Sequence, residues 1–450
     1  MAQVDNDVEF FAKEKISRIL WKIAPPVMFA LLVQALYNIV DSFFVGKFSV
    51  DGLTALSVIF PVQFVAIALA VGTGVGVNTY MARKYAQDKA DEADAAAGTG
   101  MLLEAIMWAI FAVICYVFMR PYVLTSASEA GAIAAAVTYG NIVCVGSLGL
   151  FLESCWTKVQ QAQGNMHVPM VAQVVGALLN IALDPVLIFG WGPVPQLGVA
   201  GAAYATVAGQ LAAAAITFAH GYRRPPLSMD KLLHYAGRIY HYGYASILMQ
   251  ASCTVYIVFL NVILAGFSDA AVTVLGLYYK LQTFFFIPLF GLMTCIVPVL
   301  SFNYTRRAYK RCRETIHCSC YISAVFMLLG FICFVFFPHQ VIDIFSADAA
   351  VHKIGAIAFP IIGTSFFSAV FSLMLPIVFQ AIGYGKTGSL LGLTRQIFTL
   401  MPSFWLLSLI GLNYTWLAFP FSETTAGAIS FYLYKKVSRE WKDELRNVSK

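Results

Sequence analysis

The chain has 450 residues, of which 60% are hydrophobic and only 12% are charged, with a net charge of +6. A soluble domain carries about twice that share of charged residues, so the composition excludes an ordinary soluble protein. The positive charge does not indicate nucleic-acid binding, because the basic residues are distributed over separate loops between long apolar stretches.

These apolar stretches recur along the whole chain, and each is long enough to cross a bilayer core of roughly 30 Å. We therefore predict an all-α polytopic membrane protein with about twelve transmembrane helices. The predicted spans are approximately 19–45, 53–80, 96–119, 131–156, 167–190, 198–220, 238–265, 271–300, 315–337, 352–379, 387–410 and 414–434.

The loops between the spans alternate in charge. The basic loops contain Arg83 and Lys84, Arg223 and Arg224, a group from Arg306 to Arg313, and Lys435, Lys436 and Arg439. The loops between them are nearly free of Lys and Arg. This positive-inside pattern predicts an even number of spans, with both termini in the cytoplasm.

The chain also repeats itself. Gln161–Gly164 matches Gln380–Gly383 at an offset of 219, and the same offset pairs Tyr37 with Tyr256 and Gln63 with Gln282. We predict two six-helix bundles related by a pseudo-two-fold axis along the membrane normal. The expected parts are an N-terminal lobe over 1–222, a cytoplasmic linker over 223–237, and a C-terminal lobe with a cytoplasmic tail over 238–450. A parallel repeat of this kind suggests a substrate cavity between the lobes.

The first predicted span carries a polar stripe. Gln34, Tyr37, Asn38 and Asp41 are spaced i, i+3, i+4 and i+7, so they share one helix face. Because the rest of this helix is apolar, we expect the stripe to point into the protein. An ionisable residue at membrane depth is costly and marks a functional candidate.

The fifth predicted span carries a second constellation. Asn180 and Asp184 lie one turn apart, and Pro185 removes the amide that would bond the carbonyl of Ile181. Carboxylate, amide and carbonyl oxygens suit a hard cation such as Na⁺, and a carboxylate in a dry site can instead take up and release a proton. Asp41, Asn180 and Asp184 are therefore candidate ligands of Na⁺, whereas the alternative is that both aspartates only bond neighbouring helices.

Five further ionisable residues fall within spans. Glu153 precedes Lys158 and is either functional or an interfacial ion pair, and Glu104 is expected to be structural. Lys280 either snorkels or pairs with Glu423, and Arg395 is expected to snorkel to the cytoplasmic surface. At the repeat offset Asp41 becomes Leu260 and Asp184 becomes Ser403. We therefore expect the cation chemistry in the N-terminal lobe, with Tyr256 and other aromatic residues forming a wall in the C-terminal lobe.

Together these motifs resemble the multidrug and toxic compound extrusion (MATE) family, and most nearly its DinF-like bacterial branch. The matching residues are Pro26, Gln34, Asn38, Asp41 and Gly46, then Gln161–Asn165 through Met170, Asn180, Asp184-Pro185 and Gly201–Thr206. The resemblance covers essentially the whole chain. It implies an antiporter of the bacterial inner (cytoplasmic) membrane that exports cationic, lipophilic compounds in exchange for Na⁺ or H⁺ by alternating access. By motif position, Asp41, Asn180, Asp184 and Thr206 would form the cation site, with Tyr37, Gln34 and Tyr139 nearby.

The remaining side chains are assigned to the substrate cavity as expectations: Gln34, Asn38, Tyr139, Glu153, Tyr256, Lys280 and Glu423. We expect no catalytic residues and no cofactor besides the coupling ion. The expected partners are small cationic amphiphiles and the lipid bilayer, without nucleic acid, and the protein is expected to act as a monomer.

Two other functions compete with this interpretation. A lipid-linked oligosaccharide flippase of the same superfamily would line its cavity with several basic residues, whereas only Lys280 and Arg395 lie well inside spans. An integral-membrane enzyme acting on lipids would cluster His, Asp or Ser at an interface, whereas the seven His residues occur singly near span ends.

Overall fold

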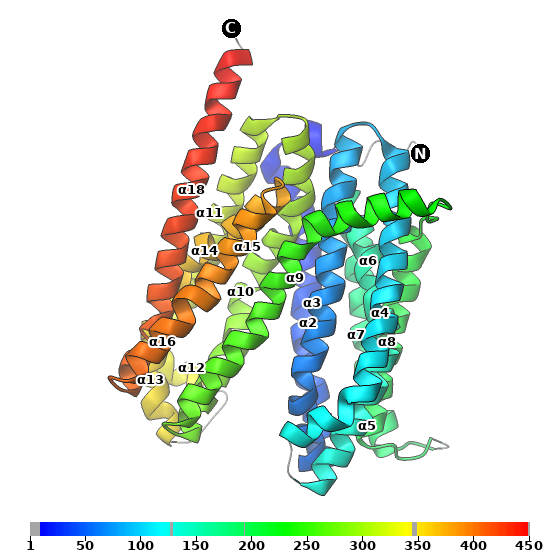
Figure 1. Cartoon of the computed structure of the whole chain (residues 1–450). Coiled ribbons are helices and arrows are strands. Elements are labelled where there is room, and N and C mark those ends of the chain that lie inside the picture. Colours follow the sequence, from blue (N-terminus) through cyan, green and yellow to red (C-terminus); the bar gives the residue numbers. More distant parts are fainter. Residues whose placement is uncertain (1–9, 127–128, 193, 344–348, 449–450) are drawn as a thin grey trace. The chain divides into compact units, whose positions relative to one another are not determined.

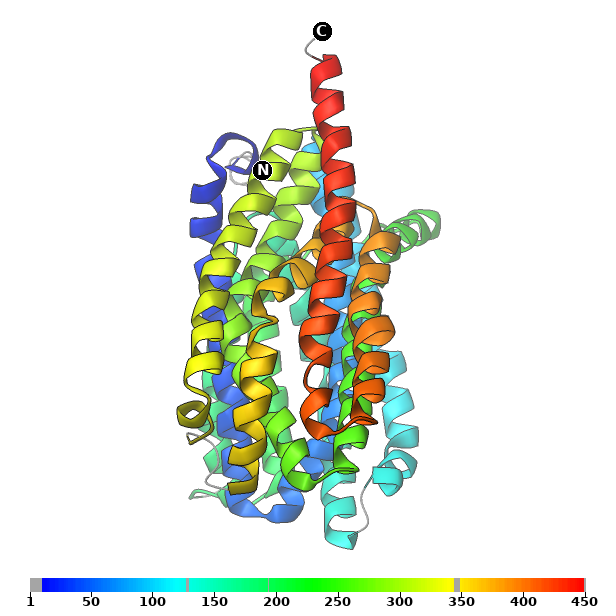
Figure 2. The same ribbon diagram turned by 90° about the vertical axis from the view of Figure 1, so that its left-hand side faces the viewer.

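The computed structural model describes residues 10–126, 129–192, 194–343 and 349–448. Within these ranges the chain is almost entirely helical, as Figure 1 and Figure 2 show, and the one β-type pairing is an isolated bridge between Trp191 and Val194. The predicted all-α class is confirmed. The helices are α2 (Ile16–Phe48), α3 (Val50–Ala86), α4 (Ala90–Ser126), α5 (Ala130–Gly146), α6 (Leu148–Ala162), α7 (His167–Phe189), α8 (Val199–Gly221), α9 (Met229–Ala265), α10 (Asp269–Thr305), α11 (Tyr309–Phe336), α12 (Pro338–Asp343), α13 (Ala349–Gly363), α14 (Phe366–Ala381), α15 (Gly385–Leu393), the π-helix η1 (Thr394–Leu400), α16 (Met401–Ser408), α17 (Leu412–Thr415) and α18 (Ala418–Val448).

The described helices supply most of the predicted membrane spans. Nine are long and apolar enough to cross a membrane, and two bent pairs bring the number to eleven. The pairs are α5 with α6, bent by 40°, and α13 with α14, bent by 56°. The twelfth predicted span, 414–434, falls on α17 and α18. It is not among these candidates, and Ser422, Glu423 and Thr424 make the start of α18 more polar than the other spans.

The described chain divides into two compact units. The first contains Pro25–Ile247, and the second contains Phe11–Ala24 and Leu248–Lys450. The division in α2 falls directly before Pro25, which with Pro26 lies inside this helix. Proline within a helix removes a backbone hydrogen bond and favours bending, so α2 can bend at Pro25 and Pro26.

The helices repeat at the offset of 219 found in the sequence. The bounds of α3 and α10 differ by 269 − 50 = 219 at the start and by 305 − 86 = 219 at the end. Their N-caps correspond as well: the backbone N–H of Gly52 donates to Ser49 Oγ over 2.8 Å, and that of Ala271 donates to Ser268 Oγ over 3.2 Å. The two units are therefore copies of one helical arrangement.

In the first unit, α7 and α8 pack with their backbones in close contact. A Cβ placed on Gly176 would lie 2.7 Å from the carbonyl oxygen of Gly209, and one placed on Gly209 would lie 2.6 Å from that of Gly176. Small residues permit this approach between membrane helices. The contact brings the following turn of α7, with Asn180, against α8, and so it positions one side of the candidate site.

Candidate functional site

The polar stripe of α2 is only partly buried. Asp41 is 8% exposed, Gln34 and Tyr37 are half-buried, and Asn38 is exposed. The stripe is therefore not buried as a whole, and the assignment of Asn38 to a substrate cavity stays a prediction. Asp41 instead lies on the side of α2 that faces the other helices of the first unit.

Asp41 approaches the polar pair of α7. Asp184 is fully buried, Asn180 is 3% exposed, and the two aspartates interact electrostatically with each other. Asn180 Nδ2 donates to Thr206 Oγ1 on α8 over 3.4 Å. The structure thus brings together Asp41, Asn180, Asp184 and Thr206, which the family resemblance had placed in one site.

Several oxygens of this site have no hydrogen-bond donor in the part of the chain that the structure describes. Among the described residues, no hydrogen-bond partner is found for Asp41 Oδ1, for Asn180 Oδ1, or for either carboxyl oxygen of Asp184. A buried carboxylate without donors is costly. Bound protons or a monovalent cation would neutralise these groups, so the arrangement fits a site for either ion.

Two tyrosines flank the carboxyl groups. The Tyr37 hydroxyl interacts with both aspartates, and the Tyr139 hydroxyl interacts with Asp41, Thr206 and Gln63. Tyr139 is buried, at 2% exposed, and its assignment to the substrate cavity stays a prediction. Gln63 on α3 was missed as a site residue, although its match to Gln282 in the repeat singled it out as a polar position shared by both halves.

Glu153 occupies a separate position on α6. Its side chain is buried, and Thr157 Oγ1 donates to its Oε1 over 2.6 Å. It also interacts with Lys158 and with Gln173 on α7. Gln173 and Asn180 are seven residues apart on α7 and share a helix face. Glu153 therefore lies beside a line of polar groups that continues along α7 to Asp184.

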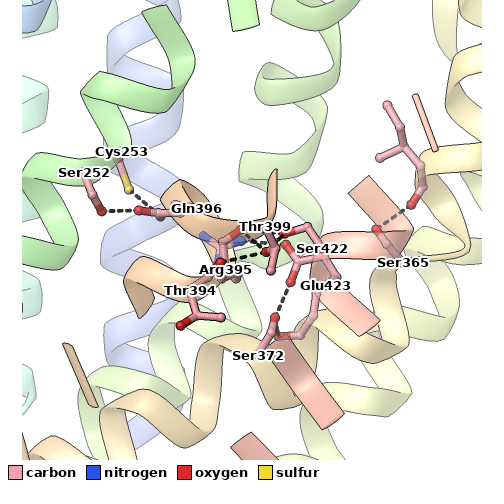
Figure 3. Close-up of polar contacts among 12 residues, drawn as sticks. Ser252, Cys253, Ser365, Ser372, Thr394, Arg395, Gln396, Thr399, Ser422 and Glu423 are labelled. Atoms are coloured by element: carbon pink, nitrogen blue, oxygen red, sulfur yellow. Dashed lines mark hydrogen bonds and ion pairs between the residues drawn. The ribbon is translucent and has the colours of Figure 1, made fainter. Parts of the chain in front are cut away.

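The second unit contains a buried ion pair that the sequence did not predict. Arg395 Nη1 lies 2.6 Å from Glu423 Oε1, and both side chains are about a tenth exposed, at 11% and 10% (Figure 3). The expectation that Arg395 snorkels is wrong, as is the alternative of a Lys280–Glu423 pair, because Lys280 is exposed. Tyr256 is 8% exposed and interacts with both members of the pair.

Comparison with known proteins places the chain in a family. The MatE family model matches residues 26–186 and 245–405, two segments that are themselves 219 residues apart. A FAD transporter of Shewanella oneidensis is 23% identical over 432 residues, which cover 94% of this chain and 95% of that protein. The multidrug export protein MepA of Staphylococcus saprophyticus is 24% identical over 425 residues, with 91% of each covered.

Solved structures share the fold. One is a MOP superfamily transporter from Pyrococcus furiosus, which is reported to have a binding pocket of reverse polarity. It has a TM-score of 0.89 at 22% identity, and the match covers 97% of this chain and 98% of the other. A mutant of the Vibrio cholerae MATE transporter VcmN has a TM-score of 0.87 at 20% identity, with 94% and 97% covered. Since the family model matches more than half of the residues in two copies, this multi-pass membrane protein belongs to the MatE family of transporters.

Proposed function

We propose that this protein is a secondary antiporter that exports lipophilic cations in exchange for Na⁺ or H⁺. The observation that supports the proposal is the set of donor-free oxygens on Asp41, Asn180 and Asp184 in the interior of the first unit. The match to multidrug export proteins supports the class of substrate. The expected location is the cytoplasmic membrane, with both termini in the cytoplasm.

The coupling step follows from the charges of the site. With both aspartates ionised, Asp41 Oδ1 and both carboxyl oxygens of Asp184 have no donor among the described residues, so the site is unstable when closed and dry. Entry of protons or of Na⁺ neutralises the carboxyl groups and favours the closed state, and Thr206 and Asn180 offer further oxygens to a metal cation. Pro25 and Pro26 give α2, which carries Asp41, a point at which to bend. Export results when substrate and coupling ion favour different conformations.

The experiment is efflux of a fluorescent lipophilic cation from proteoliposomes, driven by an imposed Na⁺ gradient or, separately, by an imposed H⁺ gradient. Asp41→Asn and Asp184→Asn are compared with the parent protein. Each variant keeps the shape of the side chain and removes its charge. Asp91→Asn, at an exposed position in the first turn of α4, is the matched control.

We expect both site variants to insert normally and to lose gradient-driven efflux, while Asp91→Asn pumps like the parent. The gradient that drives the parent identifies the coupling ion. If both Asn variants exported the dye as fast as the parent protein, the proposal would be contradicted. A parent that moves no dye under either gradient would favour the lipid-linked oligosaccharide flippase.

A second candidate function is export of an anionic flavin nucleotide. It is favoured by the similarity to a FAD transporter over 94% of this chain. Proteoliposomes loaded with FAD test it directly. If a gradient drives FAD out of the proteoliposomes but does not drive out the dye, the substrates are flavin nucleotides and not lipophilic cations.

A further inference from the structure

The second unit holds together two segments that are far apart in the sequence. The backbone carbonyl oxygens of Phe11 and Glu14 accept hydrogen bonds from Arg311 Nη2 over 2.8 Å and 2.6 Å. The Phe11 carbonyl also accepts a hydrogen bond from Asn303 Nδ2 over 3.2 Å. These contacts attach Phe11–Ala24, which we call the N-terminal arm of the second unit, to the turn between α10 and α11. Figure 2 shows the start of α2 at the same end of the unit as this turn.

The surface formed by the arm and the turn is strongly basic. The arm contains four basic residues and one acid, Glu14, whose carboxylate lies 3.2 Å from Arg18. Residues 306–314 contain five basic residues and one acid. Like charges that are held close together repel each other, so these charges oppose the attachment of the arm, and an anionic partner would remove the repulsion. The exposed side chains of this basic surface are Lys13, Lys15, Arg18, Arg306, Arg307 and Lys310.

The first unit contains the same turn with the opposite charge. Asp88 and Arg307 are 219 residues apart, and both have a positive φ, of 56° and 55°. Residues 87–95 contain four acids and one basic residue, and one of the acids, Glu92, lies 2.5 Å from Lys84 Nζ of the same unit. The turn therefore forms with either charge. Neither its backbone nor the positive-inside rule requires so many basic residues in the second unit, so they indicate a partner outside the chain.

The basic surface lies at the ends of membrane helices. α2, α10 and α11 are all long and apolar enough to span a membrane, and the basic residues precede or follow their apolar parts. On α2, Trp21 is 66% exposed and is followed by the exposed Lys22. Exposed tryptophan beside lysine is typical of the level at which headgroups meet acyl chains. Basic clusters next to a membrane helix attract anionic headgroups, and guanidinium groups bind phosphate oxygens in pairs.

We propose that the basic surface of the second unit binds the phosphate headgroups of anionic phospholipids of the surrounding membrane. The bound lipid neutralises the arm and the turn together, and so it stabilises the attachment of the arm. The equivalent turn of the first unit is acidic and does not bind these lipids. The inference goes beyond the proposed antiport and does not depend on it.

Lipid binding is measured on the purified full-length protein in detergent. Phosphatidylglycerol or phosphatidylcholine is added in increasing amounts, and the bound lipid is counted by native mass spectrometry. The test variant is Arg307→Asn/Lys310→Gln, because asparagine tolerates the positive φ at position 307. The matched control is Lys231→Gln/Arg238→Gln, which removes two exposed cations from the start of α9 in the first unit.

We expect the parent to bind phosphatidylglycerol in preference to phosphatidylcholine. The half-saturating concentration of phosphatidylglycerol should rise about 25-fold in the Arg307/Lys310 variant, since each lost cation weakens the attraction about fivefold. The control variant should keep the parent value. Equal binding of the two lipids by the parent, or undiminished binding by the variant, would overturn the proposal. Displacement of phosphatidylglycerol by an equal concentration of inorganic phosphate would assign the surface to free anions and overturn the assignment to lipid.

A second variant covers the case in which the first does not fold. Arg307→Asp/Lys310→Asp gives the second unit the residues that stand at the equivalent positions of the first, where Asp88 adopts the same positive φ. We expect its loss of phosphatidylglycerol binding to be larger than that of the neutral variant, because the new carboxylates repel the headgroup. Binding at the parent level by this folded variant would also overturn the proposal.

Hydrogen exchange tests whether the bound lipid stabilises the arm. The backbone amides of residues 11–24 are followed in nanodiscs of phosphatidylglycerol and in nanodiscs of phosphatidylcholine. We expect slower exchange in phosphatidylglycerol for the parent and for the Lys231/Arg238 control, and no difference between the lipids for the Arg307/Lys310 variants. Equal exchange in both lipids for a parent that binds phosphatidylglycerol would overturn the role of the lipid in holding the arm.

Discussion

Asn180 on α7 and Thr206 on α8 are joined by a hydrogen bond of 3.4 Å that uses the amide nitrogen of Asn180 and leaves its Oδ1 without a partner. The bond fixes the orientation of the amide, because the nitrogen is engaged by α8. The oxygen is therefore available to a cation beside Asp41 and Asp184. Thr206 orients Asn180, and in the proposed cation site its hydroxyl oxygen is a further ligand.

Thr206→Val removes the hydroxyl and keeps the shape of the side chain. If Na⁺ drives efflux, we expect its half-maximal concentration to rise about tenfold, since a lost polar contact to a charged group costs roughly 1.5 kcal/mol. Thr206→Ser retains the oxygen and should stay near the parent value. The measurement is dye efflux from proteoliposomes over a series of Na⁺ concentrations. Equal values for Val and Ser would show that the hydroxyl does not take part.

The contact between Gly176 and Gly209 should be intolerant of larger residues. We expect Gly209→Ala to lower the free energy of unfolding by about 1–3 kcal/mol, because the new methyl group overlaps the carbonyl oxygen of Gly176. Gly237→Ala in α9 is the control, since a Cβ there meets nothing within 4 Å and alanine favours a helix. Thermal unfolding in detergent compares the two. A Gly209→Ala protein as stable as Gly237→Ala would contradict the close packing of α7 and α8.

Much of the architecture was predictable from the sequence. The apolar stretches gave the helical class, and polar matches such as Gln63 with Gln282 revealed the duplication that the helix bounds and N-caps repeat. Helical spacing placed Asn180 and Asp184 on one face, and both are buried. These successes rest on signals that are local in the chain or that recur at a fixed offset.

The Arg395–Glu423 pair was not predictable in the same way. Its members are 28 residues apart on different helices, and at the repeat offset they correspond to Gly176 and Tyr204, so neither helical spacing nor the repeat links them. On the sequence alone, Arg395 was expected to snorkel to the cytoplasmic surface and not to pair inside the protein. The π-helical turn of η1 has no signature in Thr394–Leu400 that separates it from an ordinary α-helix.

Replacing one member of this ion pair should lower the free energy of unfolding more than replacing both. We expect Arg395→Gln or Glu423→Gln alone to lower the free energy of unfolding by about 3–5 kcal/mol, because each leaves a buried charge unpaired. The double variant should recover most of that loss. Chemical or thermal unfolding of the four proteins gives the coupling energy as a double-mutant cycle. Additive losses would show that the two side chains do not interact in the folded protein.

Replacing the buried Glu104 on α4 should stabilise the protein, unlike replacing one member of the Arg395–Glu423 pair. It is fully buried, and among the described residues neither of its carboxyl oxygens has a hydrogen-bond partner. Replacing an unsatisfied buried polar group by an apolar one of similar size should raise the free energy of unfolding, so we expect Glu104→Met to gain about 1–3 kcal/mol. Glu153→Met is the matched comparison and should lose stability, because it removes the acceptor of the Thr157 hydroxyl. Unfolding in detergent measures both variants, and dye efflux from the Glu104→Met protein is measured beside it. A destabilised Glu104→Met protein would show that Glu104 binds a polar partner or an ion. A stabilised protein without efflux would show that Glu104 is needed for transport although its burial lowers the stability of the fold.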